Sequence, residues 1–358
     1  MKQILCLSHS PWQASPNRTQ QLMTRLSDAK ILYFEPPSEH KEEQGRRIRS
    51  HIITYTLPAA FPVGPARTFS QRLALRRNLA FIRSTMDKHR FRNPVLWCTA
   101  PNQSHIIGRI AYNSLVYDCH REWEEDYVEQ ESELANLADV AFAASLGLVD
   151  RLSPCCDNIA LLPNGVSHIM FDRDDFSPPK ELSYLSGKPV LGRVGDLTSQ
   201  TVLTPVIAAA TEHPEWTFLL IGRVTAQVQD TLSHYRNIIL TGPVNAVELP
   251  DYLSLCSVLF DLTQNDLRGC DVLPSRIYEY MATGKPIVMM AEPDYQEPYP
   301  DVIYTAYDSI GFLRRCLKAM EETSEVLYQQ RKVYAEQSSW SNRVAEIERI
   351  LESTGLLK

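Results

Sequence analysis

The stretch Asp271–Met290, DVLPSRIYEYMATGKPIVMM, predicts a loop, a short helix and a buried strand in succession. Proline is favoured in the first turn of a helix, where its missing N–H costs nothing, so Pro274 marks the helix start. Gly284 and Pro286 end the helix. The apolar run Ile287–Met290 then has the composition of a strand buried on both faces. Loop, helix and strand in this order form half of an α/β nucleotide-binding unit, and the amides at the helix N-terminus can bind an anion.

Glu279 lies one turn into this predicted helix, where a carboxylate can accept hydrogen bonds from both hydroxyls of a ribose. On the residues alone, Glu279 could also be a solvated helix residue and Asp271 a loop carboxylate. The motif as a whole resembles the donor-binding signature of GT-B glycosyltransferases, especially those of family 4. The matching residues are Asp271, Pro274, Glu279, Tyr280, Met281, Ala282, Gly284, Lys285, Pro286 and Val288. In that family two acidic residues flank seven others, and here Asp271 replaces the usual first glutamate of the pair.

The resemblance implies an α/β protein of the GT-B fold, with two Rossmann-like domains whose parallel sheets face each other across a cleft. It implies a retaining glycosyltransferase that moves a hexose from a nucleotide diphosphate donor to a hydroxyl of a glycan or lipid-linked acceptor. The process would be bacterial cell-surface polysaccharide synthesis, of the teichuronic-acid type. Because a donor phosphate oxygen would take the acceptor's proton, no protein nucleophile is expected. The resemblance to GT-B enzymes also implies no metal or other cofactor.

The same resemblance assigns roles within the donor site. Glu279 would hold the ribose, and Asp271, a candidate catalytic residue, would hold the hydroxyls of the donor sugar. The phosphates would lie against the backbone of Val272, Leu273, Pro274, Ser275 and Arg276.

The composition fits two globular domains. With 358 residues, 44% of them hydrophobic, the chain can form two ordinary cores. No apolar run is long enough to span a membrane, and the N-terminus, MKQILCLSHSPWQ, predicts a first strand rather than a signal peptide. Eight scattered cysteines are typical of reduced cytosolic thiols, and a net charge of −7 argues against a nucleic-acid partner. We therefore expect a cytoplasmic protein.

Both halves of the chain predict alternating strands and helices, which indicates parallel sheets with helices on both faces. In the first half the expected strands are residues 3–8, 31–34, 51–57, 95–98, 115–117, 140–144 and 159–162. In the second half they are residues 190–194, 218–221, 238–240, 258–262 and 287–290. Ligands of such sheets bind at the carboxyl ends of the strands, so the loops 8–18, 98–103, 118–123 and 144–146 are expected to line a cleft.

Two of these loops carry the candidate acceptor-binding residues. The first, SHSPWQASPNRTQQL, resembles the opening of family 4 enzymes that build surface polysaccharides. Trp12 could stack on a sugar and Arg18 could bind an acidic group of the acceptor, although a Trp covering the sheet edge and a solvated Arg fit the sequence as well. Asp118 and His120 follow a predicted strand, where Asp118 would face the acceptor. His120 is the second candidate catalytic residue, which would orient an acceptor hydroxyl or touch the donor sugar; a structural histidine is the alternative.

Residues 67–92 predict a basic amphipathic helix. Arg72, Arg76, Arg83 and Arg90 share one wedge of a helical wheel beside an apolar stripe of Leu75, Leu79, Ile82 and Met86. Such a helix could lie on an anionic membrane surface, which would make the protein peripheral on the inner face of the membrane. Alternatively it could dock on its own domain, with the arginine side chains spread along the edge.

The phosphate-binding cations depart from the family pattern. Many family members place Arg and Lys after the first strand of the second domain, whereas Gly195 is followed here by DLTSQ. A glycine at this position lets the backbone approach the phosphates, but a diphosphate leaving group also needs a cation. The candidates are Arg193, Arg223, Arg268 and Arg276.

The expected organisation is an acceptor domain at residues 1–166, a linker at 167–188, a donor domain at 189–335 and a returning helix at 336–358. The closing phrase Trp340-Ser341-Asn342-Arg343-Val344 resembles the last helix of GT-B enzymes. Two alternatives stay open at this point. One is a nucleotide-sugar epimerase of the same fold, and the other is a GT-B scaffold without catalysis in a polysaccharide assembly complex.

Overall fold

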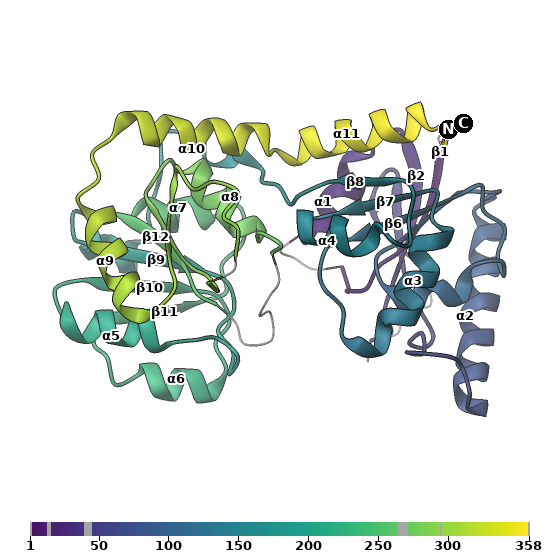
Figure 1. Ribbon diagram of the computed structural model, residues 1–358, viewed down its shortest axis with the longest axis horizontal. Coiled ribbons are helices and arrows are strands. Elements are labelled where there is room, and N and C mark those ends of the chain that lie inside the picture. Colours follow the sequence, from purple (N-terminus) through teal and green to yellow (C-terminus); the bar gives the residue numbers. More distant parts are fainter. Residues whose placement is uncertain (1, 13–15, 39–44, 264–270, 294, 357–358) are drawn as a thin grey trace. The chain divides into compact units, whose positions relative to one another are not determined.

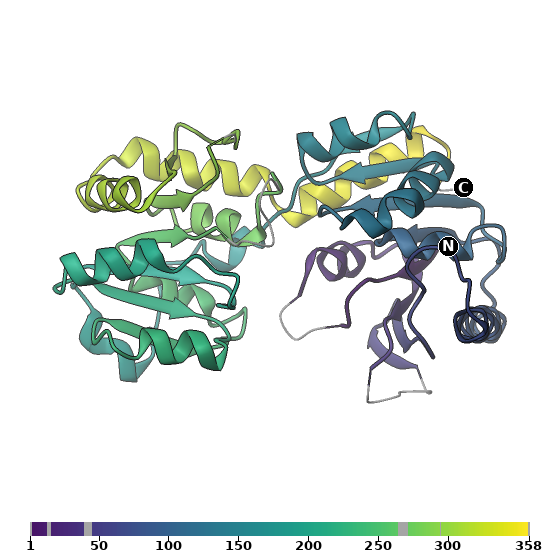
Figure 2. The same cartoon turned by 60° about the horizontal axis from the view of Figure 1, so that its bottom comes forward.

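The computed structural model describes residues 2–12, 16–38, 45–263, 271–293 and 295–356, and the chain divides into two compact units. Unit 1 comprises Met1–Asn164 and Trp340–Lys358, and unit 2 comprises Gly165–Ser339. Each unit is a central sheet with helices packed against it (Figure 1). Both ends of the chain belong to unit 1 (Figure 2).

The sheet of unit 1 has eight strands in the order β3-β4-β2-β1-β5-β6-β7-β8. The strands are β1 (Lys2–Leu7), β2 (Ala29–Glu35), β3 (Arg46–Arg49), β4 (Ile52–Thr56), β5 (Val95–Cys98), β6 (Ser114–Cys119), β7 (Val140–Ala143) and β8 (Ile159–Leu161). All neighbours run parallel except β3, which pairs antiparallel with β4 at the sheet edge. The expected parallel sheet is thus confirmed, with the correction that one antiparallel edge strand extends it.

The helices of unit 1 cover this sheet and bury its apolar faces. They are α1 (Arg18–Arg25), α2 (Phe69–Lys88), α3 (Val128–Leu137), α4 (Leu146–Leu152) and α11 (Trp340–Ser353), with the short 3-10 segments η1 (Pro101–Ile106) and η2 (Glu125–Tyr127). Although α11 ends the described chain, it belongs to this unit. Its residues Val344, Ile347 and Leu351 share a core cluster with Leu22 and Met23 of α1.

Helix α2 lies within the segment expected to be a basic amphipathic helix. Its apolar stripe is buried in unit 1: Leu75, Leu79, Ile82 and Met86 are between 0% and 8% exposed. The stripe is therefore used for packing, as a docked helix requires, and the arginines face outward. Among the described residues, no helix is long and apolar enough to cross a membrane.

The sheet of unit 2 has six strands, all parallel, in the order β11-β10-β9-β12-β13-β14. The strands are β9 (Val190–Val194), β10 (Thr217–Ile221), β11 (Ile238–Gly242), β12 (Val258–Asp261), β13 (Ile287–Met290) and β14 (Ile303–Ala306). The helices are α5 (Thr204–Glu212), α6 (Ala226–Leu232), α7 (Leu249–Ser254), α8 (Ser275–Ala282), α9 (Ser309–Met320) and α10 (Glu325–Gln337), with the 3-10 segments η3 (His168–Met170) and η4 (Lys180–Leu185).

The stretch that opened the sequence analysis folds as the predicted loop, helix and strand. Pro274 has an extended backbone and caps α8 from outside, one position earlier than the first-turn place expected for it. The helix ends at Gly284, whose φ of +74° suits glycine. The side chain of Lys285 turns inward, where Nζ donates to the carbonyl oxygens of Leu253 and Ser254 at 2.7 Å each and to that of Cys256. These carbonyls end α7, so the lysine joins two elements of unit 2 and is not available to a ligand.

Candidate functional site

The donor-site residues of unit 2 gather where β9, β12 and α8 meet. The hydroxyl of Tyr280 accepts a hydrogen bond of 2.7 Å from the backbone N–H of Val194, which ties α8 to the end of β9. Arg276, on the first turn of α8, pairs with Asp261 at the end of β12, with Nη2 at 2.7 Å and Nε at 2.9 Å from Oδ2. The order β9-β12-β13 places these strand ends side by side, as the sequence pattern requires of a ligand site.

Glu279 lies on α8 and is half-buried. Its carboxylate makes no hydrogen bond to any residue within the described part of the chain. Burial raises the pKa of Glu279 from 4.5 to about 7, although the positive charge of Arg276 opposes the rise. Such an unsatisfied, partly desolvated carboxylate fits a group whose partner is a ligand.

The four candidate phosphate-binding arginines differ in placement. Arg193 is 1% exposed, with Nε 3.4 Å from Asp261 Oδ1 and Nη1 donating to the carbonyl of Gly195 at 2.8 Å. These contacts hold the loop that follows β9, and direct contact of Arg193 with a donor stays a prediction. Arg223 is exposed and pairs with Asp196 at 2.6 Å. Arg276 retains 22% side-chain exposure, and Arg268 lies outside the described residues.

Gly195 and Gly222 shape the open backbone between β9 and β10. Gly195 has a φ of +120°, and a side chain there would point toward Arg276, whose Cδ is 3.7 Å from an ideal Cβ. Gly222 has a φ of +149°, and a Cβ there would lie 2.5 Å from the carbonyl oxygen of Gly195. Only glycine allows the backbone at residue 222 to approach Gly195 this closely. The backbone at Gly195, the Arg276 side chain and the first turn of α8 therefore lie close together, where they can bind an anion.

The remaining motif residues line the entry to α8. Leu273 is buried, whereas Asp271, Val272, Pro274 and Ser275 are half-buried. Their roles toward a donor sugar and its phosphates stay predictions.

In unit 1 the strand register brings three strand ends together. Leu7 lies opposite Cys98, and Cys98 lies opposite Tyr117. The residues that follow therefore meet at one edge. The ring of His9 lies 4.5 Å from that of His120, and Thr99 Oγ1 accepts a hydrogen bond of 2.9 Å from the backbone N–H of His9.

Both histidines are held neutral at pH 7. Burial lowers the pKa of His120 from 6.5 to about 4, and the charge of Arg18 adds to the effect. Burial also lowers the pKa of His9 to about 3, with help from His120 and Arg121. His120 Nδ1 lies 3.1 Å from the carbonyl oxygen of Asp118, whereas Nε2 is buried without a partner among the described residues. Neutral imidazoles at a strand end can donate to, or accept from, a sugar hydroxyl.

The other acceptor-site candidates are less accessible than expected. Arg18 and Asp118 form an ion pair at 2.9 Å, with side-chain exposures of 5% and 0%, and direct acceptor contact by either residue stays a prediction. The pair instead fixes α1 to the end of β6. Trp12 is half-buried; its ring packs edge-on against Tyr33 with centroids 5.0 Å apart, and its backbone N–H donates to Glu35.

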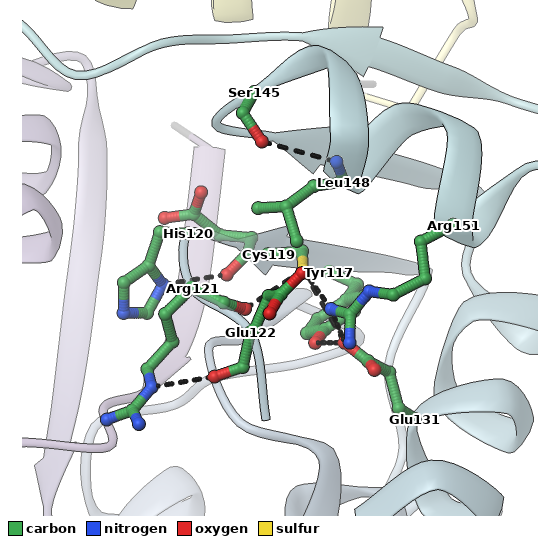
Figure 3. Close-up of polar contacts among 10 residues, drawn as sticks. Tyr117, Cys119, His120, Arg121, Glu122, Glu131, Ser145, Leu148 and Arg151 are labelled. Carbon is green, nitrogen blue, oxygen red and sulfur yellow. Dashed lines mark hydrogen bonds and ion pairs between the residues drawn. The ribbon is translucent and has the colours of Figure 1, made fainter. Parts of the chain in front are cut away.

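A cluster of buried polar side chains contacts the end of β6 (Figure 3). Glu131 of α3 accepts hydrogen bonds from the Tyr117 hydroxyl at 2.7 Å and from Arg151 Nη2 at 3.0 Å. Burial and the nearby Glu131 raise the pKa of Cys119 to about 12, so this thiol stays protonated and is not a nucleophile. The cluster orients the backbone that carries His120.

No cluster of His, Cys, Asp or Glu within the described ranges has the arrangement of a metal site. The sequence analysis did not single out His9, although it lies in the loop 8–18 that was expected to line a cleft. Its signal is its place directly after the predicted strand 3–8.

Comparison with known proteins agrees with this geometry. No family model matches the chain. The chain is 24% identical over 291 residues to a Bacillus subtilis protein described as "Putative teichuronic acid biosynthesis glycosyltransferase TuaH", a match that covers 74% of this chain and 72% of the relative.

Solved structures match over the whole chain. Sucrose-phosphate synthase from Thermosynechococcus elongatus matches with a TM-score of 0.78 and 14% identity, covering 100% of both chains. Anabaena Alr3699/HepE, determined in complex with UDP and glucose, matches with a TM-score of 0.70 and 15% identity, covering 99% of this chain and 100% of the other. The protein therefore has the GT-B glycosyltransferase fold and is a distant homologue of TuaH.

Proposed function

We propose that this protein is a glycosyltransferase that uses a nucleotide diphosphate sugar to glycosylate a hydroxyl of a glycan or lipid-linked acceptor in bacterial surface-polysaccharide synthesis. The observation that carries the proposal is Glu279, a half-buried carboxylate on α8 without a hydrogen bond to the described residues. Arg276 lies one turn before it, next to Gly195. The carboxylate, the guanidinium and the N-terminus of α8 match the ribose and the diphosphate of such a donor.

The positions of these residues assign each of them a role in donor binding. Glu279 accepts hydrogen bonds from the ribose hydroxyls, and Arg276 with the backbone around Gly195 binds the diphosphate. Asp261 holds Arg276 in place through two contacts below 3 Å. A fixed guanidinium stabilises the charge that develops on the leaving diphosphate without reorganising during the reaction.

We further propose that the donor sugar is a hexose, held by Asp271, and that its anomeric configuration is retained. The acceptor would attack from the face of the leaving group, and its hydroxyl proton would move to a phosphate oxygen of the donor. In unit 1, the unpartnered Nε2 of His120 is the group best suited to a sugar hydroxyl. This route uses no protein nucleophile, in keeping with the protonated Cys119.

Attachment to an anionic membrane through residues 67–92 stays a prediction. Since the apolar stripe of α2 is buried, the surface available to lipid consists of exposed arginines with Phe69, which is 81% exposed, and Leu73, which is 46% exposed. Liposome flotation that does not depend on anionic lipid would remove this part of the proposal.

Nucleotide binding provides the direct test. UDP should raise the midpoint of thermal unfolding, because a ligand that binds the folded state stabilises it by mass action. GDP and ADP form the comparison series, since a fold match at low identity does not fix the base. Glu279→Gln should weaken UDP binding about tenfold, because the neutral amide loses charge-assisted hydrogen bonds to the ribose.

Glu321→Gln is the matched control, since Glu321 is an exposed glutamate of the same unit. Equal nucleotide affinity for wild type and Glu279→Gln would end the assignment of the ribose site. No binding of any nucleotide would favour a scaffold role for the fold.

A further inference from the structure

Unit 1 contains a cavity of about 620 Å³ that the donor and acceptor assignments above do not use. It is lined by residues of α2, α3, the segment around η1 and the loop that follows β4. Its lining residues are Gly64, Pro65, Ala66, Arg72, Leu75, Arg76, His105, Arg109, Glu129, Gln130 and Glu133. Every one of these residues belongs to unit 1.

The charged side chains of this cavity are exposed and form no ion pairs within the described part of the chain. Arg72, Arg76 and Arg109 form no ion pair with a described residue, and the same is true of Glu129 and Glu133. Elsewhere in unit 1, by contrast, Arg18 forms an ion pair with Asp118 and Arg151 forms one with Glu131. A site that presents unpaired guanidinium groups and unpaired carboxylates together suits a ligand that carries an anion and several hydroxyls.

The walls of the cavity are held in place before any ligand binds. Gln130 is 6% exposed; its Oε1 accepts from the Gly64 backbone N–H at 2.8 Å, and its Nε2 lies 3.1 Å from His105 Nε2. Arg72 Nε donates to the Ala66 carbonyl at 3.1 Å, which ties the guanidinium to the loop. Because the loop and the guanidinium are already fixed by these hydrogen bonds, less conformational entropy is lost when a ligand binds.

The cavity also lies on the ligand-binding side of the sheet. The loop at 64–66 follows β4, η1 follows β5, and α3 follows β6 with η2 between them. These segments all leave the carboxyl ends of their strands, as His9 and His120 do.

We propose that this cavity binds an acidic sugar, whose carboxylate or phosphate pairs with Arg72, Arg76 and Arg109. The sugar hydroxyls donate to Glu129 and Glu133, and Leu75 forms the apolar floor. The inference rests on the proposed function in one respect: the acidic sugar is a unit of the glycan acceptor. It narrows the acceptor to a class, namely a glycan that bears negative charge.

The test measures binding of glucuronic acid, glucose 6-phosphate and glucose to the full chain by isothermal titration calorimetry. We expect an acidic sugar to bind, glucose to bind at least tenfold more weakly, and the affinity for the acidic sugar to fall with added salt. Arg76→Ala and Arg109→Ala should each weaken acidic-sugar binding about tenfold or more, because a charge-assisted hydrogen bond is lost.

Arg77→Ala is the matched control, since Arg77 is exposed on the same helix but does not line the cavity. It should leave the affinity unchanged. Equal loss in Arg77→Ala and Arg76→Ala, or equal binding of glucose and the two acids, would overturn the proposal. Binding of vesicles rich in anionic lipid that requires Arg76, without binding of either acidic sugar, would also overturn it and would assign the cavity to a lipid headgroup.

UDP binding separates this inference from the proposed function. The variants of the cavity leave unit 2 unaltered, so they should bind UDP as wild type does. UDP binding and sugar transfer without any acidic-sugar binding would refute the cavity assignment alone. Acidic-sugar binding that depends on Arg76, in a protein that binds no nucleotide, would uphold the cavity and refute the proposed donor.

Discussion

Replacing Glu279 with glutamine should stabilise the protein above pH 7 although it alters the group proposed to bind the ribose. The folded-state pKa of about 7 exceeds the ordinary value of 4.5 because of burial. Between these two pH values the folded protein holds a proton that the unfolded chain has released, so wild-type stability falls as pH rises from about 4.5 and levels off above about 7. At about 1.4 kcal/mol per pKa unit this amounts to at most about 3.5 kcal/mol, and to about 1 kcal/mol if solvent screens the half-buried group strongly.

Urea unfolding of wild type and Glu279→Gln at about pH 5 and about pH 8 measures the effect. We expect similar stabilities at the lower pH and a more stable variant at the higher pH. Glu321→Gln, which alters an exposed glutamate, should follow wild type at both. A stability difference that does not change with pH, or a variant less stable than wild type at pH 8, would refute the reasoning that Glu279 is desolvated for a ligand.

Three further substitutions test the packing around the donor site. Lys285→Met should lower the free energy of unfolding by about 2 kcal/mol or more, because three carbonyls that end α7 lose their donor. Arg331→Met should cost about 3 kcal/mol, since the Glu322 carboxylate, now paired with Arg331 at 2.6 Å, loses its buried cation and keeps the hydrogen bond from the Tyr304 hydroxyl; urea unfolding measures both. Gly222→Ala should weaken UDP binding at least tenfold, because a Cβ would lie 2.5 Å from the Gly195 carbonyl oxygen and force the backbone proposed to bind the phosphates to move; calorimetry measures it.

Each of these has a matched control. Lys318→Met alters an exposed lysine of unit 2 and should change stability by less than about 0.5 kcal/mol. Adding Glu322→Gln to Arg331→Met should recover part of the loss. Gly242→Ala places a Cβ at a φ of +75° with no atom within 4 Å, so UDP binding should persist. The same loss of binding in Gly242→Ala would show that backbone strain alone, and not the contact with Gly195, accounts for the effect.

The expected strands were all present because each is a run of apolar residues between turn signals, and burial on both faces leaves that pattern in the sequence. β3 escaped prediction because an edge strand needs no such pattern: RRIR is charged and largely exposed. β14, IYTA, is short and mixed in polarity, and its place is fixed by pairing with β13. The residues of a strand do not by themselves indicate which other strand it pairs with.

In the candidate site, too, local features could be predicted from the sequence and tertiary contacts could not. The loop, helix and carboxylate of the donor motif could be predicted because they are adjacent in the chain. The sharing of Asp261 by Arg193 and Arg276 could not, since these residues come from three separate elements. The same holds for the pairing of Arg18 with Asp118 at 2.9 Å. Charged residues near a predicted cleft cannot be sorted into binding and structural groups until their partners are known.

The sequence of unit 1 is interrupted by unit 2, and this has a consequence during synthesis on the ribosome. Unit 2 is one continuous segment, so it can fold as soon as it has emerged. Unit 1 must wait for α11, because Val344, Ile347 and Leu351 complete the core that α1 begins. While unit 2 is being translated, the apolar surface of α1 beneath the missing helix is uncovered and open to chaperones. A premature stop after residue 339 would therefore damage the first part of the chain to be made, while the part next to the stop would keep its core.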